Sequence, residues 1–237
     1  MTRPLLSPGE AAPKLGLVAR PSDEPPRWAP GTEVVIATTA MSPVAEALRT
    51  LRTQLALQWA DHRQVQLLSV VSAVRGEGRS FIAANLAVAF AQLHERTLLI
   101  DMDLRHARQH RIFRVDNDEG LSTLLAGGGS GHEIRRIEGC QTLSLMPAGP
   151  LPDHPQELLA PRALAPVLEQ LRPHFDVIII DTPAFSCGAD AQIVSAQARQ
   201  ALLVSAPGHA TRDETDRLVS ALRHVGVSLA GAAINRR

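Results

Sequence analysis

Short, continuous apolar runs alternate along this chain with longer segments in which apolar residues recur every three or four positions. The longer segments predict helices, and the clearest run from Ser42 to about Trp59 and over Phe81–Leu93. Apolar runs without polar alternation are typical of strands buried on both faces of a sheet. Such runs predict strands at Val65–Val71, Thr97–Met102, Leu143–Met146, Val177–Ile180, Ala201–Val204 and Ala230–Ile234.

Further helices are expected between these strands. A short helical piece starts at Gly120, and longer helices are predicted at Pro161–Leu171, Ala191–Ala198 and Asp213–Val225. Strands that alternate with helices form a mostly parallel sheet. The predicted fold class is therefore α/β: a doubly wound, mostly parallel sheet with helices on both faces. Ligands of such sheets bind at the carboxyl ends of the strands, so functional residues are expected at that edge.

The N-terminal region has a different character. Met1–Pro30 is rich in proline, alanine and charge and has no apolar period, which predicts a disordered tail. Val34–Thr39 is expected to be a short strand or an extended lead-in. Ser42-Pro43 then has the pattern of a helix start, with serine as the cap and proline in the first turn. The predicted division is a tail over residues 1–40 and one folded domain over residues 41–237.

A glycine-rich loop separates the first predicted strand from the helix that follows it. Residues 72–80 read Ser-Ala-Val-Arg-Gly-Glu-Gly-Arg-Ser. Strand, glycine loop and helix in this order are the context of a phosphate-binding loop, whose backbone N–H groups and helix N-terminus face the anion. Ser80 occupies the position that offers a hydroxyl to Mg²⁺. The alternative is a tight strand–helix turn without a ligand, because Ala73 stands where the pattern has its first glycine.

Arg79 departs from the usual loop, which has a lysine at this position to reach the β- and γ-phosphates. Arginine keeps the charge but brings a larger, planar group of donors. Lys14 is the only lysine of the chain, so a general replacement of lysine by arginine accounts for part of this departure. The expectation is that Arg79 supports nucleotide binding better than turnover.

Two other predicted strands end in acidic residues. Asp101 and Asp103 follow one apolar run, and Asp181 follows another and precedes Thr182-Pro183. An acid at the end of a fully apolar strand is costly to bury unless it binds something. In phosphate-loop proteins such acids hold Mg²⁺, often through water. The alternative, that they cap the following turns, explains one such site more easily than three.

Composition restricts the possible functions. The chain has 237 residues, is 45% hydrophobic and has a formal net charge of zero, so no basic field indicates nucleic acid as a partner. Its two cysteines, Cys140 and Cys187, cannot build a disulfide framework or a four-ligand metal site. No apolar run approaches the length of a membrane span, and the N-terminus lacks the layout of a secretion signal. A cytoplasmic location is expected.

Taken together, the motifs resemble those of the bacterial tyrosine kinases of polysaccharide export, within the MinD/ParA class of P-loop ATPases. The loop is similar to that family's P-G-E-G-K-S, with Arg75 for proline and Arg79 for lysine. Residues 98–105 (Leu-Leu-Ile-Asp-Met-Asp-Leu-Arg) resemble its second nucleotide motif, and residues 175–183 its third. Further similar segments are residues 149–159, which resemble G-x-x-P-x-x-P-x-E-L-L, and Gly231–Asn235, which resembles the closing G-V-V-L-N.

The resemblance implies ATP or ADP with Mg²⁺ as cofactors and phosphoryl transfer as the reaction. It implies a membrane chain-length determinant of polysaccharide export as a partner and homo-oligomerisation through an E-x-x-R-x-x-R helix. The implied residues are Arg79, Asp101 and Asp103 for catalysis; Arg75, Gly76, Glu77, Gly78, Arg79, Ser80, Phe81 and Asn235 for cofactor binding; Ser80, Asp101 and Asp181 for the metal; and Glu46, Arg49 and Arg52 for oligomerisation.

One departure from the family bears on the reaction. Family kinases carry a C-terminal tyrosine cluster that they phosphorylate in trans, whereas this chain contains no tyrosine. Phosphorylation of a tyrosine of its own is therefore chemically impossible.

Other readings remain open. A positioning ATPase carries a signature lysine where this chain has Val74, and an iron–sulfur carrier needs paired cysteines. A non-enzymatic ATP-binding scaffold that docks on a membrane partner is favoured by Arg79 and the missing tyrosines, whereas the intact acids favour phosphoryl transfer. His106 and His110 are four residues apart and are interpreted as a solvated face rather than a metal pair.

Overall fold

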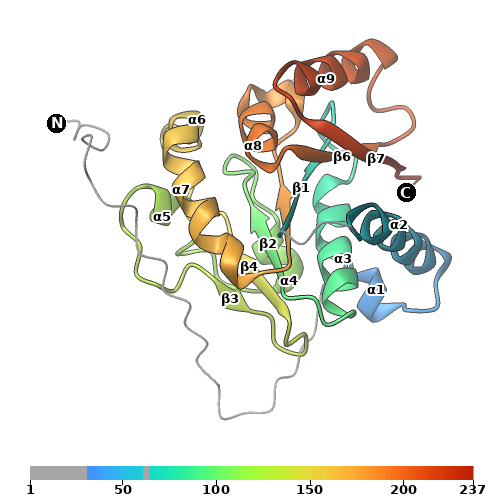
Figure 1. The fold of residues 1–237 in the computed structure, drawn as a ribbon, viewed down its shortest axis with the longest axis horizontal. Coiled ribbons are helices and arrows are strands. Elements are labelled where there is room, and N and C mark those ends of the chain that lie inside the picture. Colours follow the sequence, from blue (N-terminus) through green and yellow to red (C-terminus); the bar gives the residue numbers. More distant parts are fainter. Residues whose placement is uncertain (1–30, 61–64, 237) are drawn as a thin grey trace.

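Seven strands form one sheet in a computed structural model that describes residues 31–60 and 65–236 (Figure 1). Their order across the sheet is β3-β4-β2-β5-β1-β6-β7, and every neighbouring pair is parallel except β3 and β4. The strands are β1 (Gln66–Val71), β2 (Thr97–Asp101), β3 (Arg135–Arg136), β4 (Leu143–Met146), β5 (Val177–Asp181), β6 (Gln200–Ser205) and β7 (Ser228–Ile234). The predicted doubly wound, mostly parallel sheet is confirmed.

Helices cover both faces of this sheet (Figure 1). They are α1 (Val35–Thr38), α2 (Pro43–Trp59), α3 (Arg79–Ala91), α4 (Gln109–Phe113), α5 (Leu121–Leu125), α6 (Pro155–Leu158), α7 (Pro161–Leu171), α8 (Asp190–Ala198) and α9 (Arg212–His224). Two short 3₁₀ helices, Arg172–His174 and Phe185–Cys187, complete the set that the structure describes. None of the helices in the described residues is long and apolar enough to cross a membrane.

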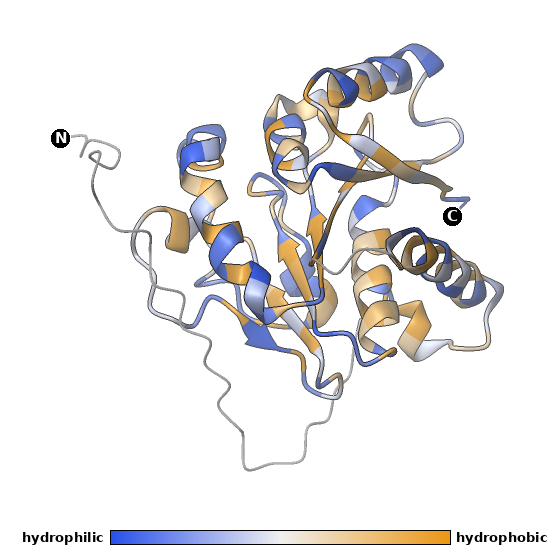
Figure 2. Cartoon of the chain, viewed as in Figure 1, coloured by the Kyte–Doolittle hydropathy of each residue, from blue (hydrophilic) through white to orange (hydrophobic). Residues whose placement is uncertain are grey.

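The central strands divide their side chains between two cores. Leu68, Leu99 and Ile179 lie in the core that also contains α1, α2 and α3. Their chain neighbours Leu67, Leu98 and Ile178 lie in the core that contains α5, α7 and α8. Successive strand side chains point to opposite faces, so both faces need apolar residues, and the strands show no polar alternation. In Figure 2 the central strands are coloured mostly as hydrophobic, whereas α2, α7 and α9 mix hydrophobic and hydrophilic residues.

Helix α2 begins where the sequence predicts. The Ser42 hydroxyl accepts a hydrogen bond from the backbone N–H of Ala45, and Pro43 occupies the first turn. This cap satisfies one of the N–H groups that a helix leaves without an intrahelical partner.

The segment before α2 is a correction to the prediction. Residues 35–38 form a helix, not a strand, and the side chains of Val34 and Ile36 are fully buried. The Asn85 side chain fixes this segment, because its Oδ1 accepts from Ile36 N and its Nδ2 donates to Glu33 O. The folded domain therefore begins before residue 41. The predicted tail over residues 1–30 lies outside the described residues.

Candidate functional site

The predicted strand–loop–helix arrangement is present. Strand β1 ends at Val71, the loop follows, and α3 begins at Arg79. Gly76 and Gly78 have φ values of +88° and +94°, a region that side chains with a Cβ rarely adopt. A Cβ at residue 78 would also overlap Nδ2 of Asn235. Both glycines are therefore required by the shape of the loop.

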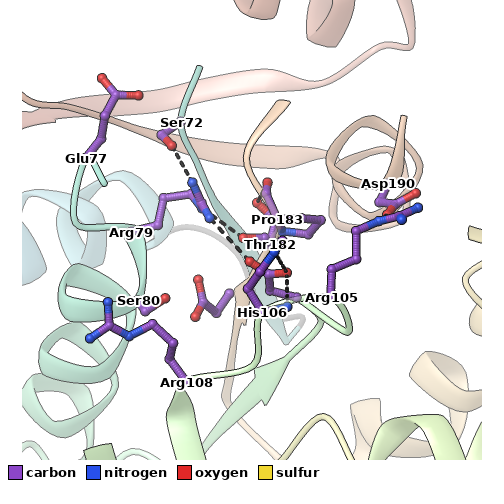
Figure 3. Close-up of polar contacts among 12 residues, drawn as sticks. Ser72, Glu77, Arg79, Ser80, Arg105, His106, Arg108, Thr182, Pro183 and Asp190 are labelled. Carbon is purple, nitrogen blue, oxygen red and sulfur yellow. Dashed lines mark hydrogen bonds and ion pairs between the residues drawn. The ribbon is translucent and has the colours of Figure 1, made fainter. Parts of the chain in front are cut away.

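Arg79 lies inside the loop and is only 7% exposed. Its Nε donates to Thr182 O at 2.8 Å, and its Nη1 donates to Ser72 Oγ and to Val74 O. Its Nη2 lies 3.5 Å from Asp103 Oδ2. Figure 3 shows the side chain directed from the start of α3 towards Ser72 and Thr182. All three guanidinium nitrogens thus have protein partners, and the side chain holds the loop to the ends of β1, β2 and β5.

Glu77 has a structural role that the sequence did not indicate. Its side chain is fully buried and points away from Arg79 in Figure 3. Its Oε2 accepts from Val74 N and its Oε1 accepts from Ala206 N, while Asn235 Nδ2 donates to its backbone oxygen. The carboxylate therefore fixes the loop to the end of β6. Because both of its oxygens are used in this way, only the backbone N–H of Glu77 stays a predicted contact of the cofactor.

The remaining predicted cofactor residues lie on the same loop and helix. Arg75 is exposed at the crest of the loop, and Ser80 and Phe81 are half-buried in the first turn of α3. Asn235 follows β7 and contacts the loop at Gly78. The fold therefore brings Asn235, near the end of the sequence, into contact with the glycine loop.

The three strand-end acids meet at the same edge of the sheet. Asp101 and Asp181 are register partners on the adjacent strands β2 and β5, and both are fully buried. Asp103, two residues beyond β2, is 5% exposed. Among the described residues, Arg79 is the arginine that forms an ion pair with this group, through Asp103. Three carboxylates and one guanidinium leave an excess of buried negative charge, which is costly without a further cation.

Asp101 is held by backbone donors. Its Oδ1 accepts from Asp103 N, and its Oδ2 accepts from Arg108 N and Gln109 N. Burial and then the nearby Asp181 raise the pKa of Asp101 to about 8 despite these hydrogen bonds. The carboxyl group of Asp101 therefore stays protonated at pH values well above those at which an ordinary aspartate ionises.

Asp181 is the acid with a free oxygen. Its Oδ2 accepts from Gln109 Nε2 at 2.7 Å, whereas its buried Oδ1 has no hydrogen-bond partner among the described residues. Burial raises the pKa of Asp181, and the Arg79 charge and the Gln109 and Ser80 side chains oppose this rise. An unpartnered carboxylate oxygen beside a serine hydroxyl is a donor set that suits Mg²⁺.

The described residues by themselves do not supply a complete set of metal ligands. In the described part of the chain, no group of three or more His, Cys, Asp or Glu side chains is placed to hold a metal ion. Mg²⁺ usually binds through one or two carboxylates together with substrate phosphates and water. Ser80 and Asp181 fit that pattern, and the remaining ligands would come from the nucleotide and solvent.

Basic side chains from the segment after β2 surround this edge (Figure 3). Arg105 Nε lies 2.8 Å from Oδ2 of the buried Asp190, and His106 Nδ1 lies 3.8 Å from Asp103 Oδ1. Arg108 Nη2 is 3.8 Å from Glu33 Oε1. These contacts were not indicated by any motif, because they depend on how the chain turns after Asp103.

The predicted oligomerisation residues lie on α2. Arg49 Nη1 is 3.2 Å from Glu46 Oε2, a local pair whose glutamate side chain is 73% exposed. Arg52 Nη1 donates to Ala89 O on α3 at 3.4 Å. Within one chain these residues therefore form a local charged face, and their role between chains stays a prediction.

Comparison with known proteins agrees with the fold and the loop. A family model for the cellulose biosynthesis protein BcsQ matches residues 65–214. The tyrosine-protein kinase YwqD of Bacillus subtilis is 34% identical over 202 residues, which are 85% of each chain. The kinase domain of Escherichia coli tyrosine kinase ETK superimposes with a TM-score of 0.80 at 30% identity and covers 86% of this chain and 79% of that chain.

A third similarity places the chain in a wider class. The septum site-determining protein MinD of Pyrococcus horikoshii, solved with Mg-ADP, has a TM-score of 0.62 at 27% identity and covers 73% of this chain and 70% of that chain. The fold and the glycine loop therefore define a P-loop ATPase of the MinD type. Within that class, the chain belongs to the family of bacterial tyrosine-protein kinases.

Proposed function

We propose that this protein binds ATP or ADP together with Mg²⁺ at the carboxyl edge of its sheet. One observation carries the proposal: the glycine loop, Asp101 and Asp181 converge on adjacent strands, with an excess of buried carboxylates and an orphaned Asp181 oxygen. The loop N–H groups and the N-terminus of α3 would hold the phosphates. Ser80 and Asp181 would hold Mg²⁺, and Asp101 would support them. The Mg-ADP complex of the similar MinD protein supports the same cofactor pair.

Calorimetry with Mg-ADP tests this proposal. Wild-type protein is expected to bind, and Asp181→Ala is expected to weaken binding because the metal loses a carboxylate. Absence of both binding heat and a thermal shift at millimolar nucleotide would refute it.

The reaction proposed from the family is phosphoryl transfer to a hydroxyl group of another protein. Bound Mg²⁺ would neutralise the phosphate charge that develops in this reaction. We propose that Asp103, which Arg79 and the backbone N–H of His106 hold in position, accepts the proton of the acceptor hydroxyl. The acceptor cannot be a tyrosine of these 237 residues, because none is present.

Arg79 is proposed to support binding better than turnover. Its nitrogens are occupied by Thr182, Ser72, Val74 and Asp103, so it must give up protein contacts before it can follow a migrating phosphoryl group. Arg79→Lys is expected to raise ATPase or kinase activity. A variant that loses activity instead would show that this site has been rebuilt around arginine.

The same observation supports a second candidate function. An Arg79 side chain that is committed to the loop also suits a non-enzymatic switch, in which nucleotide occupancy alone controls docking. The two candidates separate in one experiment. Transfer of label from γ-³²P-ATP to the cytoplasmic segment of a partner supports the kinase, whereas nucleotide-dependent docking without transfer supports the switch.

The proposed cellular role is regulation of exopolysaccharide chain length or export from the cytoplasmic side of the membrane. The support is the kinship with tyrosine-protein kinases and the match to a cellulose biosynthesis family. The proposed partner is a membrane chain-length determinant. Deletion of the gene is expected to change the amount or length of the polymer, and an unchanged polymer would contradict the role.

Self-association is proposed to use the α2 face that carries Glu46, Arg49 and Arg52. A head-to-tail contact of this kind closes a ring if the rotation between subunits permits. Light scattering with ADP and the partner's cytoplasmic segment should detect oligomers. Oligomers that persist in the variant with alanine at all three positions would show that this face is not the interface.

A further inference from the structure

Gln109, the first residue of α4, connects all three elements of the nucleotide site and belongs to none of the motifs. Its side chain is fully buried. Its Nε2 lies 2.7 Å from Asp181 Oδ2 and 3.1 Å from Ser80 O, and its backbone N lies 2.9 Å from Asp101 Oδ2. One residue therefore touches the helix behind the loop and the acids of both β2 and β5.

The contacts of Gln109 fix the orientation of its amide. The backbone oxygen of Ser80 can only accept a hydrogen bond, so Nε2 must face it, and the same nitrogen then donates to Asp181 Oδ2. The carbonyl oxygen is forced to the opposite side. This Oε1 is buried and has no hydrogen-bond partner in the described part of the chain, as is also true of Asp181 Oδ1.

The side chains of Gln109 and Asp181 are joined by one hydrogen bond, and each also has a buried oxygen without a donor among the described residues. This pair of oxygens indicates a binding position for a ligand. An unsatisfied buried acceptor is costly to the folded state, which makes such a pair of atoms a candidate for completion by a ligand. Both atoms are oxygens, which are the ligands that Mg²⁺ and its bound waters prefer. An anion would instead require donors, and the Gln109 donors are already used.

We propose that Gln109 is a positioning residue for Mg²⁺ at this site. One amide N–H holds Asp181 through Oδ2 and leaves Oδ1 available for the metal, while the other donates to Ser80 O. The Gln109 Oε1 would accept a hydrogen bond from a water that the metal retains. This inference rests on the proposed function, because the metal is expected to bind together with nucleotide. Partners that orient metal ligands in this way typically change metal affinity about 10–100-fold.

The test compares Gln109→Met with Gln200→Met. Gln200 begins β6 at the opposite edge of the sheet, where its Oε1 accepts from Trp59 Nε1 at 2.9 Å, so its replacement also removes an amide hydrogen bond but lies far from the site. Two quantities are measured for each protein. One is the affinity of the ADP-loaded protein for Mn²⁺, from the loss of the free Mn²⁺ signal in electron paramagnetic resonance. The other is the affinity for a fluorescent ADP analogue in EDTA.

The expected result is Mn²⁺ affinity about 10–100-fold weaker in Gln109→Met, with metal-free ADP affinity and the Gln200→Met protein unchanged. Gln109→Asn keeps an amide but shortens the reach to Asp181, so it should weaken Mn²⁺ binding as well and replaces the Met variant if that variant does not fold.

Unchanged Mn²⁺ affinity in the folded Gln109 variants overturns the inference. An equal loss of metal-free ADP binding also overturns it, because Gln109 would then only support the loop. If the wild type binds the ADP analogue neither in EDTA nor in Mg²⁺, the proposed function is wrong, and the inference about Gln109 is wrong as well because it rests on that function.

Discussion

The amino and carboxyl ends of the central strands, here called the amino edge and the carboxyl edge, both carry arginine and aspartate. The two groups differ in burial and in the balance of charge. At the amino edge, Arg96 and Asp176 form a close ion pair, with Arg96 Nη2 2.6 Å from Asp176 Oδ1 and side chains that are 57% and 36% exposed. At the carboxyl edge, the buried Arg79 pairs with Asp103, and the buried acids Asp101 and Asp181 lie in the same group. The pair at the amino edge is balanced in charge and partly exposed, whereas the carboxyl edge has surplus carboxylates and an Asp181 oxygen without a partner among the described residues.

The two ends therefore differ in what their charged groups contribute to stability. A surface ion pair contributes about 0–1 kcal/mol and leaves nothing unsatisfied. A buried excess of carboxylates raises the pKa of Asp101 and Asp181 and destabilises the protein until a cation arrives. Charged residues of identical type therefore mark structure at one edge and a candidate metal–nucleotide site at the other.

The largest expected effect is the loss of the buried arginine. Arg79→Ala should lower the free energy of unfolding by about 3–5 kcal/mol, because it leaves the acids without their cation and the loop without its clamp. Arg96→Ala, the matched change at the amino edge, should cost about 0.2–1 kcal/mol. Urea denaturation of both variants measures the difference. Similar losses at the two edges would contradict the comparison.

A second, smaller effect separates stability from binding. Asp181→Asn removes one surplus charge while its side-chain oxygen can still accept from Gln109, so the nucleotide-free protein should become more stable at pH 8. The factor by which Mg²⁺ strengthens ADP binding should fall about 100-fold. Asp176→Asn should change neither nucleotide affinity nor its dependence on Mg²⁺. Thermal unfolding and titration with a fluorescent ADP analogue report the two quantities. A destabilised Asp181→Asn variant with normal Mg-ADP binding would contradict the account.

The dependence of stability on pH should differ between the edges as well. Asp101 has a folded-state pKa of about 8, above its unfolded value, so its contribution to stability is full below about pH 4 and is lost as the pH rises towards 8. The slope is at most about 1.4 kcal/mol per pH unit for one group. The pKa of Asp176 is lowered by Arg96, so its contribution is lost only as the pH falls through that lowered value. Denaturation from pH 5 to 8 without nucleotide should therefore show declining stability, and a flat or rising profile would argue against a buried acid excess.

The sequence predicted most of the sheet and the positions of the site residues. Strands buried on both faces leave continuous apolar runs, so Leu143–Met146 and the helix Pro161–Leu171 have the bounds that the pattern predicts. Asp101 and Asp181 could be placed together because parallel strands end at one edge.

Other features depend on contacts between distant residues and leave no local signal. The short helix α1 is stabilised by hydrogen bonds with Asn85, which lies 49 residues from Ile36. Glu77 has the position of a ligand in the loop motif, but its partner Ala206 N is reached only in the folded chain. Gln109 carries no motif, and only its contacts with Ser80 and Asp181 reveal it.

The central claim is that the carboxyl edge is a metal–nucleotide site, and thermal unfolding with ADP tests it most directly. The melting temperature of the wild type is compared in ADP with EDTA and in ADP with Mg²⁺, beside Asp181→Asn under the same conditions. A ligand at 100 times its dissociation constant stabilises a protein by about 2.7 kcal/mol. The account predicts a Mg²⁺-dependent rise of several degrees in the wild type that is absent from Asp181→Asn. Equal melting temperatures for the wild type with and without Mg²⁺ at millimolar ADP would contradict it.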